Sequence, residues 1–421
     1  MRRAPLPAWV ERIKRLNARL SPNIRVQVVT SLLGGLYRGG FTAVWQPFVL
    51  YLGGSVTFLG LLESLGGWGG AISCLMQLLG GWLADRLGRR PVLIFSSLFV
   101  VLSFACFTLA AWLYLWPLLV PGVILAGMGL LGRAAGSSVT AESAETRRRG
   151  LAYGVTMFAF ALAMVGSSIV GGLVSDRWGY FPVMLASLIL EALVLVTIIR
   201  FLRETLPREK RSIARLDWRG LLRAWSSLLV LAIPLAGDSF SFGVAASILF
   251  GILKDAYRFT DVQLGWINAF FYLSWAVAQL PVGRLVDRYG CKPFLIIAES
   301  GLGVCIVIWL LWPTFVGMAL AYLLLGFTAA LWIPALLKLV AGHVAKPQRG
   351  VATGIIFTIQ GLARFPTPYL AAWLYAWWGY SAPLLVGLGG SVLVVIAMGI
   401  LIREPPADGG EAAEEDAVPP R

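Results

Sequence analysis

The sequence predicts an all-α membrane protein with twelve transmembrane helices in two pseudo-symmetric six-helix bundles. Composition is the first observation behind this prediction: of 421 residues, 58% are hydrophobic and 13% are charged, whereas a soluble domain carries about 25% charged residues. The apolar residues form runs long enough to cross a hydrocarbon layer of roughly 30 Å. The second observation is that these runs repeat in order. A large soluble protein with buried helices is the alternative, and the continuous apolar runs argue against it.

The polar interruptions divide the chain into twelve expected spans. These are residues 26–52, 56–83, 91–113, 117–140, 150–173, 180–202, 226–252, 262–285, 293–312, 313–338, 350–375 and 380–402. The expected domains are an N-terminal segment (1–25), a first bundle (26–202), a linker (203–225), a second bundle (226–402) and an acidic tail (403–421). Because the tail is rich in Pro, Gly and acidic residues, we expect it to be disordered.

The basic residues lie almost entirely on one side of this plan. If both termini are on the same side, the other side carries only Arg177, Lys254 and Arg258 among the loop bases. An excess of Lys and Arg marks the cytoplasmic side of a membrane protein. The basic residues that give the net charge of +14 are therefore expected to set the membrane topology and to contact anionic lipid headgroups. No nucleic-acid partner is expected. We expect a multi-pass protein of the plasma (inner) membrane with cytoplasmic termini and no cleaved signal peptide.

The residues of common enzymatic sites are missing from the sequence. The four cysteines form no CxxC pair, and His343 is the single histidine, so neither a disulfide framework nor a metal site is expected. The sequence holds no Walker loop, which argues against ATP-driven transport. We expect a monomer that is not an enzyme, has no cofactor and uses a proton or other ion gradient.

Three landmarks show that the chain is an internal duplication. They are Asp85 and Asp287, which are 202 residues apart, Arg149-Gly150 and Arg349-Gly350, 200 apart, and Trp178-Gly179-Tyr180 and Trp378-Gly379-Tyr380, also 200 apart. Repeated halves are a hallmark of secondary transporters, in which two bundles move around a site near the bilayer midplane.

One stretch between the second and third spans, GGWLADRLGRRP, carries a specific resemblance. It contains Gly81-x-x-x-Asp85-Arg86-x-Gly88-Arg89-Arg90, which resembles in full the loop signature of the major facilitator superfamily. A weaker copy, Gly283-x-x-x-Asp287-Arg288-x-Gly290, lies between the eighth and ninth spans. The resemblance implies a transporter of twelve spans that exposes its site to each side in turn.

The resemblance also implies a conformational role for this signature. Asp85 is expected at the N-terminus of span eleven, where the helix dipole favours an anion, and Arg89 is expected to pair with Glu142. Gly81 is expected at a helix end in a close helix contact, and Gly88 suits a turn with positive φ. The alternative is that these bases only set the topology. In the second copy, Cys291 replaces a base and Gly342 replaces the acid, so a second latch through Asp287 and Arg288 is less complete.

Charged residues inside the expected spans need a reason, because each costs about 2.5–3.5 kcal/mol to insert. Arg38 and Asp238 are 200 residues apart, so they occupy equivalent positions and are expected to face each other across the central cavity. A buried structural pair is the alternative. Arg133 resembles the span-four arginine of proton-coupled drug exporters. Arg364 fits a cavity position or a structural one, and Glu63 fits the pathway or a solvated helix end.

The leading hypothesis is a secondary active transporter, a proton-coupled exporter of small amphipathic or drug-like molecules, with Asp238 as the proton carrier. The alternative is ion-coupled uptake or exchange of a small organic anion, because three in-span arginines outnumber one clear acid. A non-transporting membrane receptor is the third hypothesis. The sequence assigns no role to Glu191 or Glu299, which lie on the peripheral spans six and nine.

Overall fold

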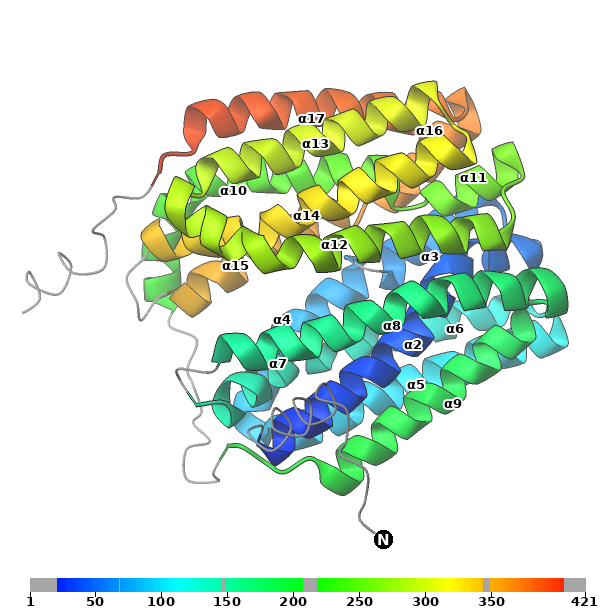
Figure 1. Ribbon diagram of the computed structural model, residues 1–421, viewed down its shortest axis with the longest axis horizontal. Helices are drawn as coiled ribbons and strands as arrows, with labels where there is room; N and C mark the ends of the chain where they lie inside the picture. Colours follow the sequence, from blue (N-terminus) through cyan, green and yellow to red (C-terminus); the bar gives the residue numbers. More distant parts are fainter. Residues whose placement is uncertain (1–20, 68, 146–148, 207–217, 344–348, 405–421) are drawn as a thin grey trace, which may run out of the picture.

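The computed structural model describes residues 21–67, 69–145, 149–206, 218–343 and 349–404 (Figure 1). Helices of the first half are α2 (Pro22–Tyr51), α3 (Val56–Gly66), α4 (Ala71–Leu87), α5 (Arg89–Leu113), η1 (Trp116–Leu118), α6 (Leu119–Met128), η2 (Gly129–Leu131), α7 (Gly132–Ser143), α8 (Arg149–Trp178) and α9 (Tyr180–Phe201). Helices of the second half are α10 (Trp218–Ala246), α11 (Leu249–Tyr257), α12 (Asp261–Tyr289), α13 (Lys292–Leu311), α14 (Phe315–His343), α15 (Arg349–Arg364), α16 (Thr367–Trp378) and α17 (Ser381–Leu401).

The two halves are separate helical bundles that lie side by side, as Figure 1 shows, and the part of the chain described here contains no strand. Nine helical stretches within the described ranges are long and apolar enough to cross a membrane. The remaining expected spans, the first, eighth and eleventh, are helical too, as α2, α12 and α15 with α16. The all-α membrane fold is therefore confirmed, although α10 already begins at Trp218, inside the expected linker 203–225.

Three expected spans are interrupted instead of continuous. The second span breaks between α3 and α4, the seventh between α10 and α11, and the eleventh between α15 and α16. In the second span the chain passes through a glycine-rich segment in which Gly69 has φ +90°, a conformation that a residue without a side chain adopts readily. Irregular backbone at membrane depth is tolerated where protein buries it or where it lines a water-filled cavity.

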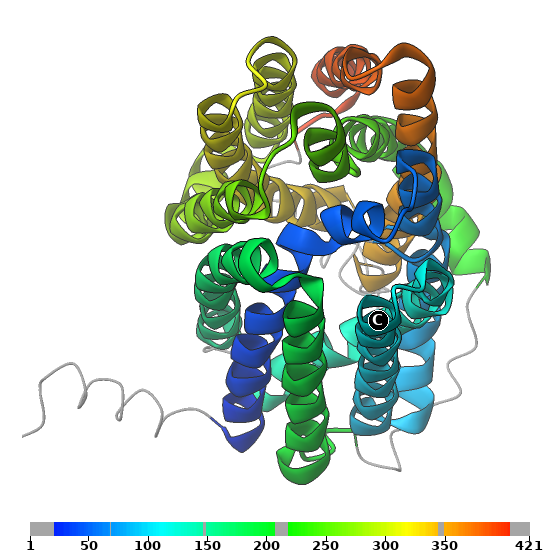
Figure 2. The ribbon, with the colours of Figure 1, turned by 90° about the vertical axis from the view of Figure 1, so that its right-hand side faces the viewer.

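The halves contact each other mainly at one end of the bundles. We call the end where α2 begins and α17 ends the terminal end (left in Figure 1), and the opposite end, which faces the viewer in Figure 2, the far end. One apolar core near the far end combines side chains of both halves, such as Phe48 and Leu59 with Val244, Ile252 and Ala371. Toward the terminal end, the described apolar cores belong to one half each.

Hydrogen bonds between the halves follow the same distribution. The Gln46 side chain bonds to the carbonyl oxygen of Ser247 and the amide of Gly251, both at 2.7 Å. Asn268 of α12 donates to the hydroxyls of Thr42 (3.0 Å) and Ser168 (2.8 Å). These bonds lie in the far half of the bundles, so the structure is closed at the far end.

Candidate functional site

Three charged residues interact around the breaks of the second and eleventh spans, and we call them the Arg364 cluster: Glu63, Asp238 and Arg364. Arg364 ends α15, and its guanidinium carbon lies 4.9 Å from the centre of the Phe242 ring. It interacts electrostatically with Asp238 of α10 and Glu63 of α3. The cluster therefore joins one carboxylate from each half to a cation beside the broken backbone. Charged groups at broken helices near the midplane are typical of transporter binding sites.

Glu63 is a half-buried residue near the end of α3. Its Oε1 accepts a hydrogen bond of 2.8 Å from Nε1 of Trp45, an 8% exposed side chain. The break that follows brings Gly69 against the side chain of Arg364. Because Gly69 has a positive φ and no Cβ, Arg364 can approach the second span closely.

The two arginines of the first half form a second group. Nε of Arg38 donates to the hydroxyl of Tyr37 at 3.0 Å, and Nη1 of Arg133 donates to Oε1 of Gln77 at 3.1 Å. Arg38 and Arg133 are also close enough to interact electrostatically. In the structure, the guanidinium beside Asp238 is that of Arg364. The structure therefore does not bring the expected pair of Arg38 and Asp238 together.

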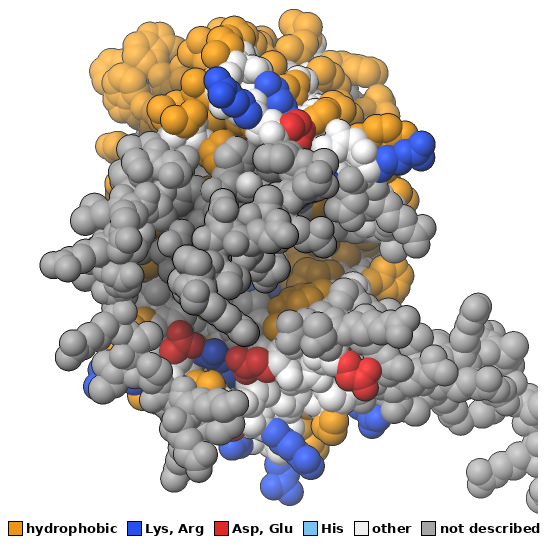
Figure 3. Space-filling model, turned by 90° about the vertical axis from the view of Figure 1, so that its left-hand side faces the viewer, with side chains coloured by type: hydrophobic (Ala, Val, Ile, Leu, Met, Phe, Trp, Pro, Cys, Tyr) orange, Lys and Arg blue, Asp and Glu red, His pale blue; other side chains and the backbone are white. Residues whose placement is uncertain are grey.

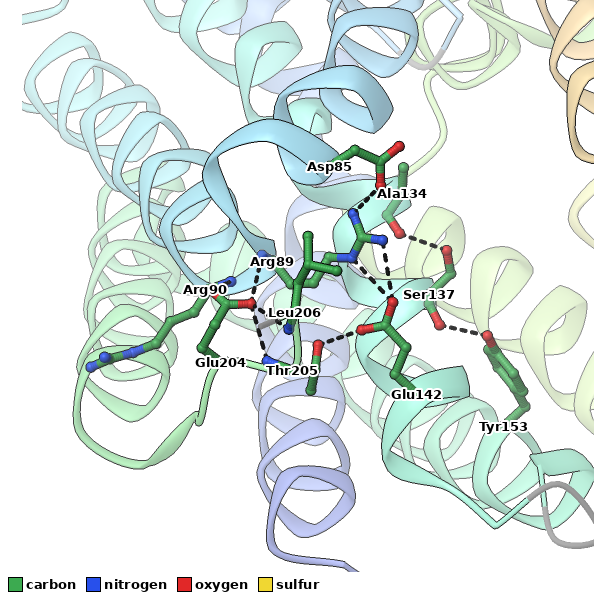
Figure 4. Close-up of polar contacts among 10 residues, drawn as sticks. All are labelled: Asp85, Arg89, Arg90, Ala134, Ser137, Glu142, Tyr153, Glu204, Thr205 and Leu206. Atoms are coloured by element: carbon green, nitrogen blue, oxygen red, sulfur yellow. Dashed lines mark hydrogen bonds and ion pairs between the residues drawn. The ribbon is translucent and has the colours of Figure 1, made fainter. Parts of the chain in front are cut away.

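At the terminal end, Arg89 links both acids that the motif predicts (Figure 4). Its Nη1 lies 2.5 Å from Oδ1 of Asp85, and its Nη2 lies 3.2 Å from Oε1 of Glu142. Thr205 donates a further hydrogen bond of 2.5 Å to Oε2 of Glu142. The expected contact between Arg89 and Glu142 is thus present. Asp85 forms an ion pair with Arg89 of its own half. The expected contact of Asp85 with the N-terminus of span eleven stays a prediction for another conformation.

The remaining motif residues have separate contacts. The side chain of Arg86 lies over the Trp82 ring at 5.3 Å, and Nη2 of Arg90 donates to the carbonyl of Ile199 at 2.6 Å. In the second copy, Arg288 lies over the Tyr289 ring at 5.2 Å. The side chain of Asp287 lies outside the described residues.

The glycines of the motif are partly as expected. Gly88 has φ 107° and its repeat mate Gly290 has φ 91°, so the prediction of positive φ is confirmed. Gly81, however, lies inside α4 and not at its end, and a Cβ added there would lie 3.9 Å from Ala134. The close contact instead belongs to Gly80, where a Cβ would collide with the carbonyl of Leu131.

Glu204 is a site residue that the motif did not indicate. Its carboxylate accepts hydrogen bonds from the backbone amides of Arg89 (3.0 Å), Arg90 (3.2 Å), Thr205 (3.0 Å) and Leu206 (3.0 Å). Burial works to raise the pKa of Glu204, but these donors outweigh it and lower the pKa below its usual value. An anion at the start of α5 also suits the helix dipole.

The second half repeats this contact with Glu404. Its carboxylate accepts hydrogen bonds from the amides of Cys291 (3.1 Å) and Lys292 (2.5 Å) at the start of α13. Burial and the adjacent Glu404 raise the pKa of the Cys291 thiol to about 12. The signal was present in the sequence, because Arg203-Glu204 and Arg403-Glu404 stand 200 residues apart, like the other landmarks. On the terminal end, charged side chains of the described residues gather in two groups (Figure 3).

At the far end, Asp176 joins the two halves. Its Oδ1 and Oδ2 accept hydrogen bonds from the backbone amides of Asp261 (3.1 Å) and Val262 (3.0 Å) at the start of α12. Lys254 binds Asp261 at 2.7 Å. A carboxylate of the first half thus caps a helix of the second half, as the motif predicts for Asp85 at the opposite end.

Comparisons with known proteins agree on one family. The model of the Major Facilitator Superfamily matches residues 28–253 and 231–420. The class D tetracycline resistance protein of Salmonella ordonez is 26% identical over 358 residues, which cover 79% of this chain and 84% of that protein. Hippocampus abundant transcript-like protein 1 of Homo sapiens is 26% identical over 343 residues, 76% of this chain and 64% of that protein.

Solved structures show the same fold. The human organic anion transporter MFSD10 (TETRAN) superposes with a TM-score of 0.66 at 22% identity, covering 90% of this chain and 99% of that one. A D-xylose-proton symporter superposes with a TM-score of 0.71 at 17% identity, covering 92% and 98%.

Proposed function

This chain is a membrane transporter that belongs to the Major Facilitator Superfamily, and we propose that it exports small amphipathic or drug-like molecules by proton-coupled alternating access. The observation that carries this proposal is the Arg364 cluster, in which Arg364 interacts with a carboxylate of each half. The tetracycline resistance proteins among its relatives support the export of drug-like molecules.

The cluster suggests how a proton is coupled to movement. Glu63 ties Arg364 to the first half and Asp238 ties it to the second. A proton on Asp238 removes one of these two attractions, so the protonated and ionised forms favour different arrangements of the halves. A ligand or proton shifts such an equilibrium only through different interactions with the two states, and Arg364 provides that difference.

The orientation follows from the charges of the loops. Among the described residues at the loops, the bases Arg86, Arg89, Arg90, Arg288 and Lys292 lie at the terminal end, and Arg177, Lys254 and Arg258 lie at the far end. We therefore place the terminal end in the cytoplasm of a plasma (inner) membrane protein. The structure, closed at the far end, is then the inward-facing state. An exporter loads its cargo from the cytoplasm in this state.

A second candidate function, transport of a small organic anion, has its own support. Arg38 and Arg133 lie close together in the first half, and guanidinium groups bind carboxylate and phosphate well. The fold-level neighbour MFSD10 is an organic anion transporter by its title. This candidate shares the transport cycle and differs only in cargo.

Reconstitution tests the proposal and separates the candidates. Proteoliposomes with an imposed pH gradient are supplied with tetracycline, with a cationic dye, or with a labelled aromatic carboxylate. We expect uphill movement of tetracycline or the dye by the wild type and its loss in Asp238→Asn, because Asn is nearly isosteric and cannot release a proton. Downhill exchange is expected to survive in this variant. Full gradient-driven accumulation by Asp238→Asn would remove it as the proton carrier, and uphill movement of the carboxylate alone would favour the second candidate.

A further inference from the structure

Two buried glutamates that the sequence left without a role occupy related places in the two halves. Glu191 of α9 is 3% exposed and Glu299 of α13 is 1% exposed. Ser97 of α5 donates to Oε1 of Glu191 at 2.5 Å, and Ser391 of α17 donates to the backbone carbonyl of Glu299 at 3.2 Å. Each half therefore buries one acid and one serine between equivalent helices.

The acid and the serine have exchanged places between the halves. Ser97 stands 202 residues before Glu299, and Glu191 stands 200 residues before Ser391, which are the offsets of the other repeated landmarks. In both halves, an acid is therefore buried between the same two helices of the bundle. It comes from α9 in the first half and from α13 in the second. The repetition of a buried acid at this place indicates a site that both halves share.

The third member of each site has opposite charge. In the first half, Arg38 of α2 interacts with Glu191. In the second half, its repeat mate Asp238 of α10 interacts with Glu299. The first site holds a cation and an anion, which balance without any proton. The second site holds two carboxyl groups on the neighbouring helices α10 and α13, close enough to interact.

Two carboxylates in contact inside a protein cannot both stay ionised. Both carboxylate oxygens of Glu299 are buried, and among the described residues neither makes a direct hydrogen bond. The nearby hydroxyl of Ser391 donates to the backbone carbonyl of Glu299 instead. Buried polar atoms usually have a partner, and only a proton between the two carboxyl groups turns their contact into a hydrogen bond. One proton leaves the pair with a single negative charge.

The surroundings fit this charge. The cation that interacts with Asp238 is Arg364 of α15, and Arg364 in turn meets Glu63 of α3 and Cys74 of α4. The helix α17 faces the pair with Ser391. On α14, Lys338 donates to the carbonyl of Val286, toward the terminal end, and Tyr322 packs on Trp309.

We propose that Asp238 and Glu299 form a carboxyl pair that binds a single proton, with Glu299 as its buried member. Asp238 is only half-buried whereas Glu299 is buried, so the proton enters and leaves through Asp238. On release, the O–H bond of the pair breaks, its electrons stay on the carboxylate, and the proton passes to water at Asp238. The protonation itself is independent of the proposed function, and only its use in coupling rests on proton-driven transport.

Infrared spectroscopy of the purified full-length protein in detergent tests the pair without any transport. The carbonyl-stretch band of a protonated carboxyl is recorded at neutral pH for the wild type, for Asp238→Asn with Glu299→Gln, and for the matched control Glu191→Gln. We expect the wild type and the control to share a band that the double variant lacks. Folding of each variant is checked by gel filtration. The single variant Glu299→Asp keeps both carboxyl groups of the pair, so we expect it to show the band.

Each outcome decides the proposal. A double variant with the wild-type band overturns it, and so does a control that loses the same band, because Glu191 would then hold a proton beside Arg38. Gradient-driven tetracycline transport by Glu299→Gln is measured separately. If the double variant lacks the band but Glu299→Gln still accumulates tetracycline against its gradient, the protonated carboxyl pair is supported. Its proposed use in proton coupling is then wrong.

Discussion

Replacing Asp176 by Asn is expected to open the far end of the molecule. The wild-type carboxylate accepts two backbone hydrogen bonds, at 3.1 and 3.0 Å, from the start of α12. Asn keeps one acceptor oxygen and loses the negative charge, so one charge-assisted bond and the dipole interaction disappear. Such a bond contributes about 1.5–3 kcal/mol, and because Asp176 is exposed, we reduce this to about 1 kcal/mol. The population closed at the far end then falls roughly fivefold relative to the open one.

Distance measurements between spin labels follow this shift. Labels are placed by Trp116→Cys and Trp312→Cys, exposed positions at the far end of the two halves, after replacement of the four native cysteines. The matched control is Asp255→Asn, a far-end carboxylate that bonds at 2.6 Å to Tyr375 within the second half. We expect a longer-distance population in Asp176→Asn and none in the control. An unchanged distribution in Asp176→Asn, or the same change in both variants, refutes the reasoning.

Three further predictions concern the terminal end. Asp85→Asn is expected to slow transport severalfold with nearly unchanged substrate affinity, because the residue biases conformations without touching cargo; equal loss of binding affinity in the inward-open and the closed form contradicts this. Glu204→Gln is expected to lower the free energy of unfolding by about 1 kcal/mol at pH 7. Because folding lowers the pKa of Glu204, its contribution is complete above the unfolded value of about 4.3. This contribution is lost as the pH falls through the lowered pKa, so the difference in melting temperature between the two proteins is expected to shrink in acid. Gly80→Ala is expected to cost about 1–3 kcal/mol by overpacking, while Gly81→Ala is tolerated; equal melting temperatures of the two variants argue against the assigned contact.

The architecture could be predicted because it depends on properties that single residues carry. Apolar runs gave the spans, and fixed offsets gave the duplication. The glycines Gly88 and Gly290 were predictable for the same reason, since a positive φ is a property of one position. The breaks were not foreseen, because the residues around Phe365 keep the apolar composition of a continuous span.

The site was predicted only in part, because helix rotation decides which side chains meet. Equivalent sequence positions suggested that Arg38 and Asp238 face each other, whereas in the structure each interacts with a glutamate of its own half. The Arg364 cluster depends on the break beside Gly69, which hydropathy does not register. Glu204 and Glu404 were accessible to sequence analysis, because they share the offset of 200 with the other landmarks.

Proton movement during transport by the wild-type protein is the most direct measurement of proton-coupled export. Proteoliposomes contain a pH-sensitive dye, and tetracycline is added outside with and without an imposed pH gradient. If the chain couples protons to cargo, tetracycline moving in one direction is expected to drive protons in the other, and its uphill accumulation is expected to stop when the gradient is collapsed. Accumulation of tetracycline that is equal with and without the gradient, with no change in the internal pH, would contradict proton-coupled export.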